Sequence, residues 1–291
     1  MSRTTTGRGG SAPGSDGAAD STDVVSRIDP YIRALGRGLV STVPQLEGPL
    51  STCRGWYAHA YIRYVQRRHA RRYVAPIDPY RIAWVDADRI EYVAEPTRIP
   101  RFRCAGAVVD GDWDRTGVRF TDLDVYRAFE MRFEEGREWS ETPFFDRVLD
   151  EIRAGEEPWG CDSRAALEDR CARLDRLYET IATEGFRTQP ELMAEEADDP
   201  IGSRRRSEIC RRINDEIAID VARDGELLFA DGRNRLAIAK LLGVEEIPVL
   251  ILRRHAEWIP FRDRVAEHVE ETGVLPSALG DHPDLEQLAP E

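Results

Sequence analysis

One short run near the C-terminal end, Asp231-Gly232-Arg233-Asn234-Arg235, combines residue types that suit a phosphate group. A glycine lets backbone amides approach a ligand closely. A helix that begins there directs unpaired N–H groups and the positive end of its dipole at the same point. Arg233 and Arg235 add charged, forked donors that match phosphate oxygens. The run therefore predicts an anion-binding turn, although a plain strand–turn–helix with two surface arginines fits the same residues.

The residues around the turn predict the elements that position it. Alternating apolar residues indicate a strand, Asp224-Gly225 indicates a hairpin, and Gly243 ends the helix that follows the turn. The expected ranges are 217–221 and 227–230 for the hairpin strands, 233–242 for the helix and 247–252 for a further strand. Upstream, apolar periodicity predicts helices over about 121–133, 142–153 and 163–184, extended segments near 84–93 and 102–114, and a mobile loop over 193–212.

From about Ala172 to Leu252 this order resembles the N-terminal domain of ParB and its relatives, the sulfiredoxins and the archaeal free-serine kinases. LYETIATEG (177–185) is similar to the family's L-x-x-S/T-I-x-x-x-G helix, and DGRNR and IPV (247–249) are similar to its G-x-x-R turn and last strand. The resemblance implies an α+β fold, with a small mixed sheet and flanking helices. It also implies that nucleotide phosphates bind at the turn, on Asp231, Gly232, Arg233, Asn234 and Arg235.

Three departures from the family narrow that implication. Sulfiredoxins carry their catalytic cysteine where this chain has Arg233, which excludes sulfiredoxin chemistry. Many relatives have a histidine where this chain has Asn234, whose amide donates a hydrogen bond but carries no titratable proton. No helix-turn-helix is recognisable after Leu252, so a role in chromosome partitioning is a poor prediction. Phosphate binding is therefore a safer expectation than catalysis.

Five other side chains are candidates for chemistry. Asp112 or Asp114, in the Gly/Asp-rich segment after an expected strand, could hold Mg²⁺ with a nucleotide, and Asp114 is the candidate catalytic residue of the two; the alternative is a turn anchored by Trp113. His255 follows the last strand and is a candidate catalytic residue, although a lone histidine at a sheet end is more often packed or solvated. Glu184 or Glu216 could act as a general base, and the sequence gives no geometry to choose between them.

A basic and aromatic segment, Ser51–Ile77, contains no acidic residue. It predicts a helix in which Trp56 and Tyr64 share one face and which the prolines from Pro76 onward stop. Arginines pair with phosphates and tyrosines stack on bases, so the segment suits a nucleic acid. In the alternative, the aromatic face packs against the C-terminal domain and the arginines pair with the protein's own carboxylates.

Composition bounds the remaining inferences. The net charge is −13 over 291 residues, and Lys240 is the one lysine among 41 basic residues. Acid-rich, lysine-poor chains are typical of halophilic organisms, where the acidity aids solubility, so the net charge does not exclude a nucleic-acid partner. No run of 18 apolar residues and no signal peptide are recognisable, which predicts a cytoplasmic protein without a membrane partner.

We expect four regions in the chain. They are a disordered tail (1–23), a mainly helical basic and aromatic region (24–95), the ParB/sulfiredoxin-like domain (96–258), and a C-terminal helix and tail (259–291). Two main functions are consistent with this layout. One is an enzyme, a phosphotransferase or nucleoside triphosphatase that uses a nucleoside triphosphate with Mg²⁺. The other is a module that binds a nucleotide or nucleic acid without chemistry; a purely structural interaction protein is the least favoured.

Overall fold

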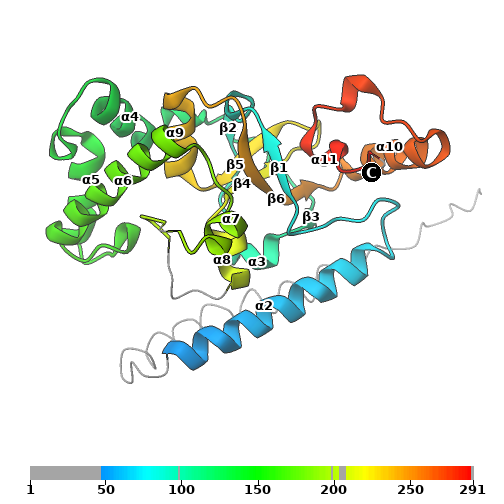
Figure 1. Cartoon of the computed structure of the whole chain (residues 1–291), viewed down its shortest axis with the longest axis horizontal. Coiled ribbons are helices and arrows are strands. Elements are labelled where there is room, and N and C mark those ends of the chain that lie inside the picture. The colour runs from blue at the N-terminus through cyan, green and yellow to red at the C-terminus, as the bar shows by residue number, and fades with distance from the viewer. Residues whose placement is uncertain (1–46, 98, 198, 203–207, 290–291) are drawn as a thin grey trace, which may run out of the picture. The chain divides into compact units, whose positions relative to one another are not determined.

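A mixed β-sheet is the framework of the chain (Figure 1). The structure, a computed structural model, describes residues 47–97, 99–197, 199–202 and 208–289. Within these residues six strands form one sheet in the order β1-β6-β4-β5-β2, and β3 also pairs with β6. The strands are β1 Ile82–Val85, β2 Tyr92–Val93, β3 Ala107–Val109, β4 Ile217–Val221, β5 Leu227–Asp231 and β6 Ile247–His255. The expected α+β class is confirmed at this level.

The β4–β5 hairpin lies at the centre of the functional argument. The two strands are antiparallel, and β4 also pairs in parallel with β6. Gly225 closes the hairpin with φ +90°, and the amide of Ala222 donates to the carbonyl of Glu226 at 2.9 Å. The predicted hairpin and its turn signal are therefore confirmed, and the next strand, β6, extends three residues further than expected, to His255.

Most helices follow their local signals. Residues 101–104 form a short helix where an extended segment was expected from residue 102, and the predicted helix over 121–133 is an α-helix, Asp124–Phe129, that continues as a π-helix, Glu130–Glu134. Helix α9 (Arg233–Leu242) begins after Gly232 and ends at Gly243, whose φ is +61°. The predicted helices at 142–153 and 163–184 are α5 (Pro143–Arg153) and α6 (Arg164–Glu184), capped by the side chains of Thr142 and Ser163. The others are α2 Glu47–His69, α3 Arg101–Cys104, α4 Asp124–Phe129, α7 Gln189–Ala194, α8 Glu208–Asn214, α10 Ile259–Thr272 and α11 Pro283–Glu286.

Both faces of the central strands are covered. Ile217, Ile219 and Val221 of β4 pack into a core shared with α4, α5, α6 and α9. Ala218 points to the opposite face, where it joins a smaller core with Ile62 of α2 and residues of α3 and α8. Helices therefore lie on both sides of the sheet (Figure 1), and all five residues of β4 are buried.

Helix α2 confirms the predicted helix but not its packing. The buried positions are Gly55, Ala58, Ile62 and His69. The helix ends at His69, well before the prolines that we expected to stop it. Trp56 and Tyr64 are instead 75% and 60% exposed. The alternative in which the face of Trp56 and Tyr64 packs against the C-terminal domain is therefore wrong, because small and β-branched side chains let α2 approach the sheet closely on its other side.

The structure also contradicts the loop expected over 193–212 and the domain boundary expected at residues 95 and 96. The region 193–212 is not one loop, because α7 ends in it, α8 lies largely within it, and the side chain of Asp199 is 4% exposed. The expected domain boundary at residues 95 and 96 falls inside one sheet, because β1 and β2 pair with β6 and β5.

The described residues from Ser51 onward belong to one compact unit. The expected tail 1–23 and the start of the region 24–95 lie outside the described residues. The residues after 258 form α10 and α11, and Asp284 of α11 is buried against Arg254, so this part is more than a polar tail. No helix among the described residues is long and apolar enough to cross a membrane.

Candidate functional site

Gly232 forms the turn between β5 and α9, and its conformation has a structural cause. Its φ of +92° is a left-handed conformation that favours glycine. A Cβ at this position would lie 2.9 Å from the Cα of Ile217 and 3.3 Å from the carbonyl oxygen of Glu216. The backbone at the start of β4 therefore fills the space that the sequence had assigned to a ligand. The glycine lets the turn pack against β4. A ligand would therefore contact the atoms beside Gly232 and not the position of its missing Cβ.

The first turn of α9 carries hydrogen-bonding groups that have no partner in the described part of the chain. The amide of Gly232 donates to the carboxylate of Asp231 at 2.7 Å. The next two amides, of Arg233 and Asn234, have no acceptor among the described residues, as is usual at the start of a helix. The side chain of Asn234 is 7% exposed, and its Oδ1 has no partner there either. Two donors and one acceptor thus remain unmet at the positive end of the helix dipole.

The two arginines of the turn have different environments. Arg235 is buried, and its guanidinium lies 2.5 Å from the carboxylate of Asp199. Asp199 also accepts from the side-chain amide of Gln189 at 3.0 Å and borders a hollow of about 320 Å³ beside α7. Arg233 is exposed, and its guanidinium lies over the ring of Trp159, 5.4 Å from the ring centroid. Arg233 is therefore the arginine of the run that a ligand could reach directly.

The candidate base beside this turn is Glu216. It is 1% exposed, and a carboxylate oxygen accepts a hydrogen bond from the amide of Gln189. Burial raises the pKa of Glu216 to about 7, although that hydrogen bond and the nearby Arg235 and Arg101 act in the opposite direction. Glu184, the other candidate, is half exposed and pairs with Arg187. The geometry therefore selects Glu216, which can gain or lose a proton near neutral pH.

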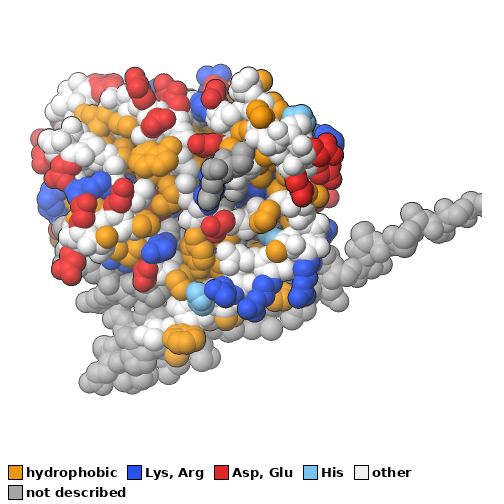
Figure 2. Space-filling model, turned by 45° about the vertical axis from the view of Figure 1, so that its right-hand side comes forward, with side chains coloured by type: hydrophobic (Ala, Val, Ile, Leu, Met, Phe, Trp, Pro, Cys, Tyr) orange, Lys and Arg blue, Asp and Glu red, His pale blue; other side chains and the backbone are white. Residues whose placement is uncertain are grey.

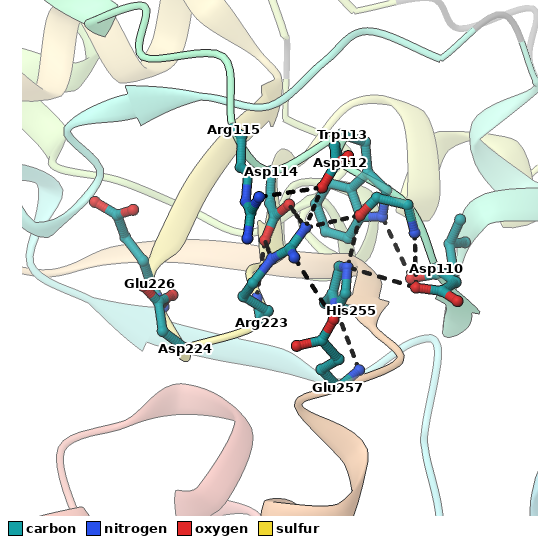
Figure 3. A network of polar contacts seen from close by, with 12 residues as sticks. Asp110, Asp112, Trp113, Asp114, Arg115, Arg223, Asp224, Glu226, His255 and Glu257 are labelled. Carbon is teal, nitrogen blue, oxygen red and sulfur yellow. Dashed lines mark hydrogen bonds and ion pairs between the residues drawn. The ribbon is translucent and has the colours of Figure 1, made fainter.

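Asp114 lies at the opposite end of the hairpin, beside its loop (Figure 3). Arg223 from the loop clamps it with two hydrogen bonds, Nε to Oδ2 at 2.8 Å and Nη2 to Oδ1 at 2.7 Å. The side chain of Asp114 is 2% exposed. These hydrogen bonds hold the pKa of Asp114 at about 2, so it stays charged at neutral pH and its oxygens are occupied.

His255 belongs to the same cluster as Asp114 (Figure 3). Its Nε2 lies 2.8 Å from the carbonyl oxygen of Gly111, and its Nδ1 accepts from the amide of Glu257 at 3.1 Å. These contacts assign the ring proton to Nε2, which leaves neither nitrogen free for proton transfer.

The same contacts bear on a possible metal centre. Ligand atoms of His255 and two exposed carboxylates, Asp110 and Glu257, lie within 4.8 Å of one another. A metal would need a free lone pair on the ring. Nε2 carries the proton, and Nδ1 is held by the amide of Glu257. This group therefore does not fit a metal centre in the observed arrangement.

The predicted site residues thus fall into two groups. Asp114 and His255 come together at the loop end of the hairpin, and the DGRNR turn lies at the other end. The strand β4, Ile217–Val221, separates them by roughly 13 Å along its length. The structure therefore does not bring Asp114 or His255 to the turn. It adds Asp199, Gln189 and Trp159, to which the sequence reasoning gave no functional role.

Comparison of the chain with protein-family models, with curated proteins and with solved structures found no match in any of the three.

Proposed function

We propose that this protein binds a phosphate-bearing ligand, a nucleotide in the first instance, at the N-terminus of α9. The observation that carries the proposal is the pair of unmet amides at Arg233 and Asn234. Phosphate oxygens accept from such amides and gain from the helix dipole. The unpartnered Oδ1 of Asn234 is an acceptor, so it suits a hydroxyl group of the ligand and not a phosphate oxygen. The resemblance to ParB/sulfiredoxin-like domains is part of this proposal, since members of that family bind nucleotide phosphates at the corresponding turn.

A nucleoside triphosphate with Mg²⁺ is the cofactor that we propose. Of the three carboxylates around the turn, Asp199 is occupied by Arg235, and Glu216 is buried. Asp231 is half exposed, with Arg101 3.5 Å away, so it is the residue suited to hold the ion. Oxygen ligands of this kind suit Mg²⁺ when the phosphates supply further oxygens. Asp114 is too distant to share an ion with a phosphate on the turn.

An enzymatic form of the proposal assigns a role to Glu216. A carboxyl group with a pKa of about 7 can exchange a proton at neutral pH. Because Glu216 is 1% exposed, its action as a base on a water molecule or an acceptor hydroxyl group requires that ligand binding opens a path to it. Such a base would serve a nucleoside triphosphatase or a phosphotransferase. The backbone amides of Arg233 and Asn234 would position the phosphate, and the side chain of Asn234 has no titratable proton to transfer.

Ligand titration tests the proposal. We expect ATP, CTP or ADP with Mg²⁺, in high-salt buffer, to raise the unfolding temperature of the wild-type chain. The Arg233→Ala variant should need about tenfold more nucleotide to reach the same rise in unfolding temperature. Arg176→Ala is the matched control, since Arg176 is an exposed arginine of α6, and it should bind as the wild type does. No thermal shift with any of the nucleotides would contradict the proposal.

The enzymatic form has a separate test. Phosphate release from the bound nucleotide should exceed the uncatalysed background and should fall in Glu216→Gln while nucleotide binding persists. Binding without release would leave the protein as a binding module and remove the role of Glu216 as a base.

A second candidate function, nucleic-acid binding by α2, is favoured by one observation. Trp56 and Tyr64 are largely exposed. The arginines of α2 and the loop after it are exposed as well; they are Arg54, Arg63, Arg67, Arg68, Arg71 and Arg72. Basic side chains gather along the lower edge of the face in Figure 2. Stacking aromatics beside arginines suit a single-stranded nucleic acid.

Gel shifts with single- and double-stranded DNA at several salt concentrations test this candidate. Binding of DNA by the wild type should weaken steeply as the salt concentration rises. Replacing Arg67, Arg68, Arg71 and Arg72 together by alanine should abolish this binding. Binding that survives this change would show that α2 is not the contact surface.

A further inference from the structure

Trp159 has a backbone conformation that a bulky residue seldom adopts. It lies in a short 3₁₀ turn, Pro158–Gly160, between α5 and α6, with φ +61° and ψ 15°. A large side chain in this left-handed region is strained and persists where the surroundings fix it. Phe144 of α5 contacts the indole edge-on, with ring centroids 5.0 Å apart. The strain therefore presents a half-buried indole beside the start of α9.

Two arginines share this indole. The guanidinium carbon of Arg170 from α6 lies 5.8 Å from the ring centroid, and that of Arg233 from α9 lies 5.4 Å from it. Neither arginine pairs with a carboxylate in the described part of the chain, although the sequence holds 54 acidic residues. The Nε of Arg170 is buried and has no partner among the described residues.

The electrostatics of Arg170 also differ from those of a surface arginine. Burial, followed by the nearby charge of Arg173, lowers the pKa of Arg170. The guanidinium groups of Arg170 and Arg233 contact the same indole, and neither is neutralised by a carboxylate of the described residues, so an anion beside that ring would supply the missing counter-charge. A guanidinium that lies over an aromatic ring keeps N–H donors available to a phosphate group.

We propose that Trp159, Arg170 and Arg233 form a second phosphate subsite, adjacent to the N-terminus of α9. Arg233 is the first residue of α9 and connects the two subsites. The ligand is then a chain of linked phosphates, free or as the diphosphate or triphosphate of a nucleotide, in preference to a single phosphate group. This inference rests on the proposed function, because the first phosphate occupies the amides of the same helix.

Calorimetric titration with orthophosphate and pyrophosphate tests the second subsite in the full-length protein. The wild type should bind pyrophosphate at least about tenfold more tightly than orthophosphate, since a charge-assisted hydrogen bond to phosphate is typically worth that factor. Arg170→Ala should lose this preference and keep its orthophosphate affinity within about twofold. Arg176→Ala, on the exposed side of the same helix, should retain the preference.

Further variants separate binding from folding. Arg170→Lys keeps the charge but loses the forked donors and should lose most of the preference, while circular dichroism reports whether each variant is folded. Pyrophosphate should change the tryptophan fluorescence of the wild type, and this change should be much smaller in Trp159→Phe.

The outcomes are distinct. Equal affinity for the two probes, or equal losses for both in Arg170→Ala, would overturn the second subsite and leave the first intact. Failure of both probes to bind the wild type would overturn the proposed function itself.

Discussion

The two ends of the β4–β5 hairpin use similar residues for different purposes. At the loop end, Arg223 clamps Asp114 and both ring nitrogens of His255 have partners. At the turn end, Arg235 also pairs with a buried aspartate, but the first amides of α9 and the Oδ1 of Asn234 remain without partners in the described residues. Residue type therefore does not distinguish the two ends of the hairpin, whereas the unmet amides at the start of α9 do.

The carboxyl groups of Asp114 at the loop end and Glu216 at the turn end have pKa values shifted in opposite directions. Hydrogen bonds from Arg223 hold the pKa of Asp114 at about 2, which fixes it as a charged partner. Burial instead raises the pKa of Glu216 to about 7, which makes it titrate in the neutral range. One group is locked in one protonation state, and the other can change state during function.

The largest effect that we predict on stability is that of Glu216→Gln. The pKa rises from 4.5 in the unfolded chain to about 7 in the folded one, so the native state keeps a proton that the unfolded state releases. The free energy of unfolding of the wild type should therefore fall by up to about 3 kcal/mol as the pH rises from 4.5 to 7, and Glu216 should cause no further change above pH 7. The Glu216→Gln variant has no titrating group at this position, so its free energy of unfolding should not show this fall. Urea unfolding of both proteins at pH 5 and pH 8 measures the difference.

The matched control for this experiment is Glu184→Gln, because Glu184 is half exposed. It should follow the wild type across the whole pH range. If the free energies of unfolding of Glu216→Gln and the wild type differ by the same amount at pH 5 and pH 8, Glu216 has no raised pKa.

The second prediction concerns the loop end. Asp114→Ala should lower the free energy of unfolding by about 2 kcal/mol, because it leaves the donors of Arg223 without their main acceptor. Nucleotide affinity, measured calorimetrically on the folded variant, should not change. Asp112→Ala is the control: Asp112 also contacts Arg223, at 3.0 Å, but is 75% exposed, so its loss should cost less than about 1 kcal/mol. Weaker nucleotide binding by Asp114→Ala would place the loop end in the binding site.

The third prediction is a smaller effect at His255. His255→Gln should cost about 1.5 kcal/mol, because the buried ring loses its hydrogen bond to Gly111 and its packing against Trp113. Any phosphate release by the wild type should persist in this variant. A variant that is stable and binds nucleotide but no longer releases phosphate would restore His255 as a catalytic residue.

The smallest effect on stability is predicted for Arg233→Ala, which removes an exposed side chain. The free energy of unfolding should change by less than about 0.5 kcal/mol, whereas nucleotide affinity should fall about tenfold. Thermal unfolding with and without nucleotide gives both quantities from one series. Unchanged affinity would remove Arg233 from the binding site and weaken the contrast between the two ends.

Local signals account for what the sequence could predict. Three signals depend only on neighbouring residues, and the structure confirms each of them. They are the strand alternation of Ile217, Ile219 and Val221, the hairpin turn at Asp224-Gly225, and the end of helix α9 at Gly243. The charged connector gave no such signal for Asp199, because its burial depends on Arg235, 36 positions later. Likewise, the role of Trp159 depends on arginines from two helices that the fold brings together.

The packing of α2 was missed for a related reason. Helical periodicity gives the faces of a helix, but the choice of buried face depends on what the sheet presents. Here the residues packed around Ala58 and Ile62 include Phe102 and Leu250, so a narrow face is buried and the aromatic one remains exposed. Glu216 could be named from the sequence, but its selection over Glu184 required the fold.

Backbone amide NMR during a nucleotide titration tests the central claim most directly. The ¹⁵N-labelled protein, with ATP and Mg²⁺ added stepwise in high salt, should show its largest shift changes at the amides of Gly232, Arg233 and Asn234. The amides of Gly111 and Glu257 at the loop end should move little. Shifts concentrated at the loop end, or no shifts at either end at saturating nucleotide, would contradict the assignment of the phosphate site to the start of α9.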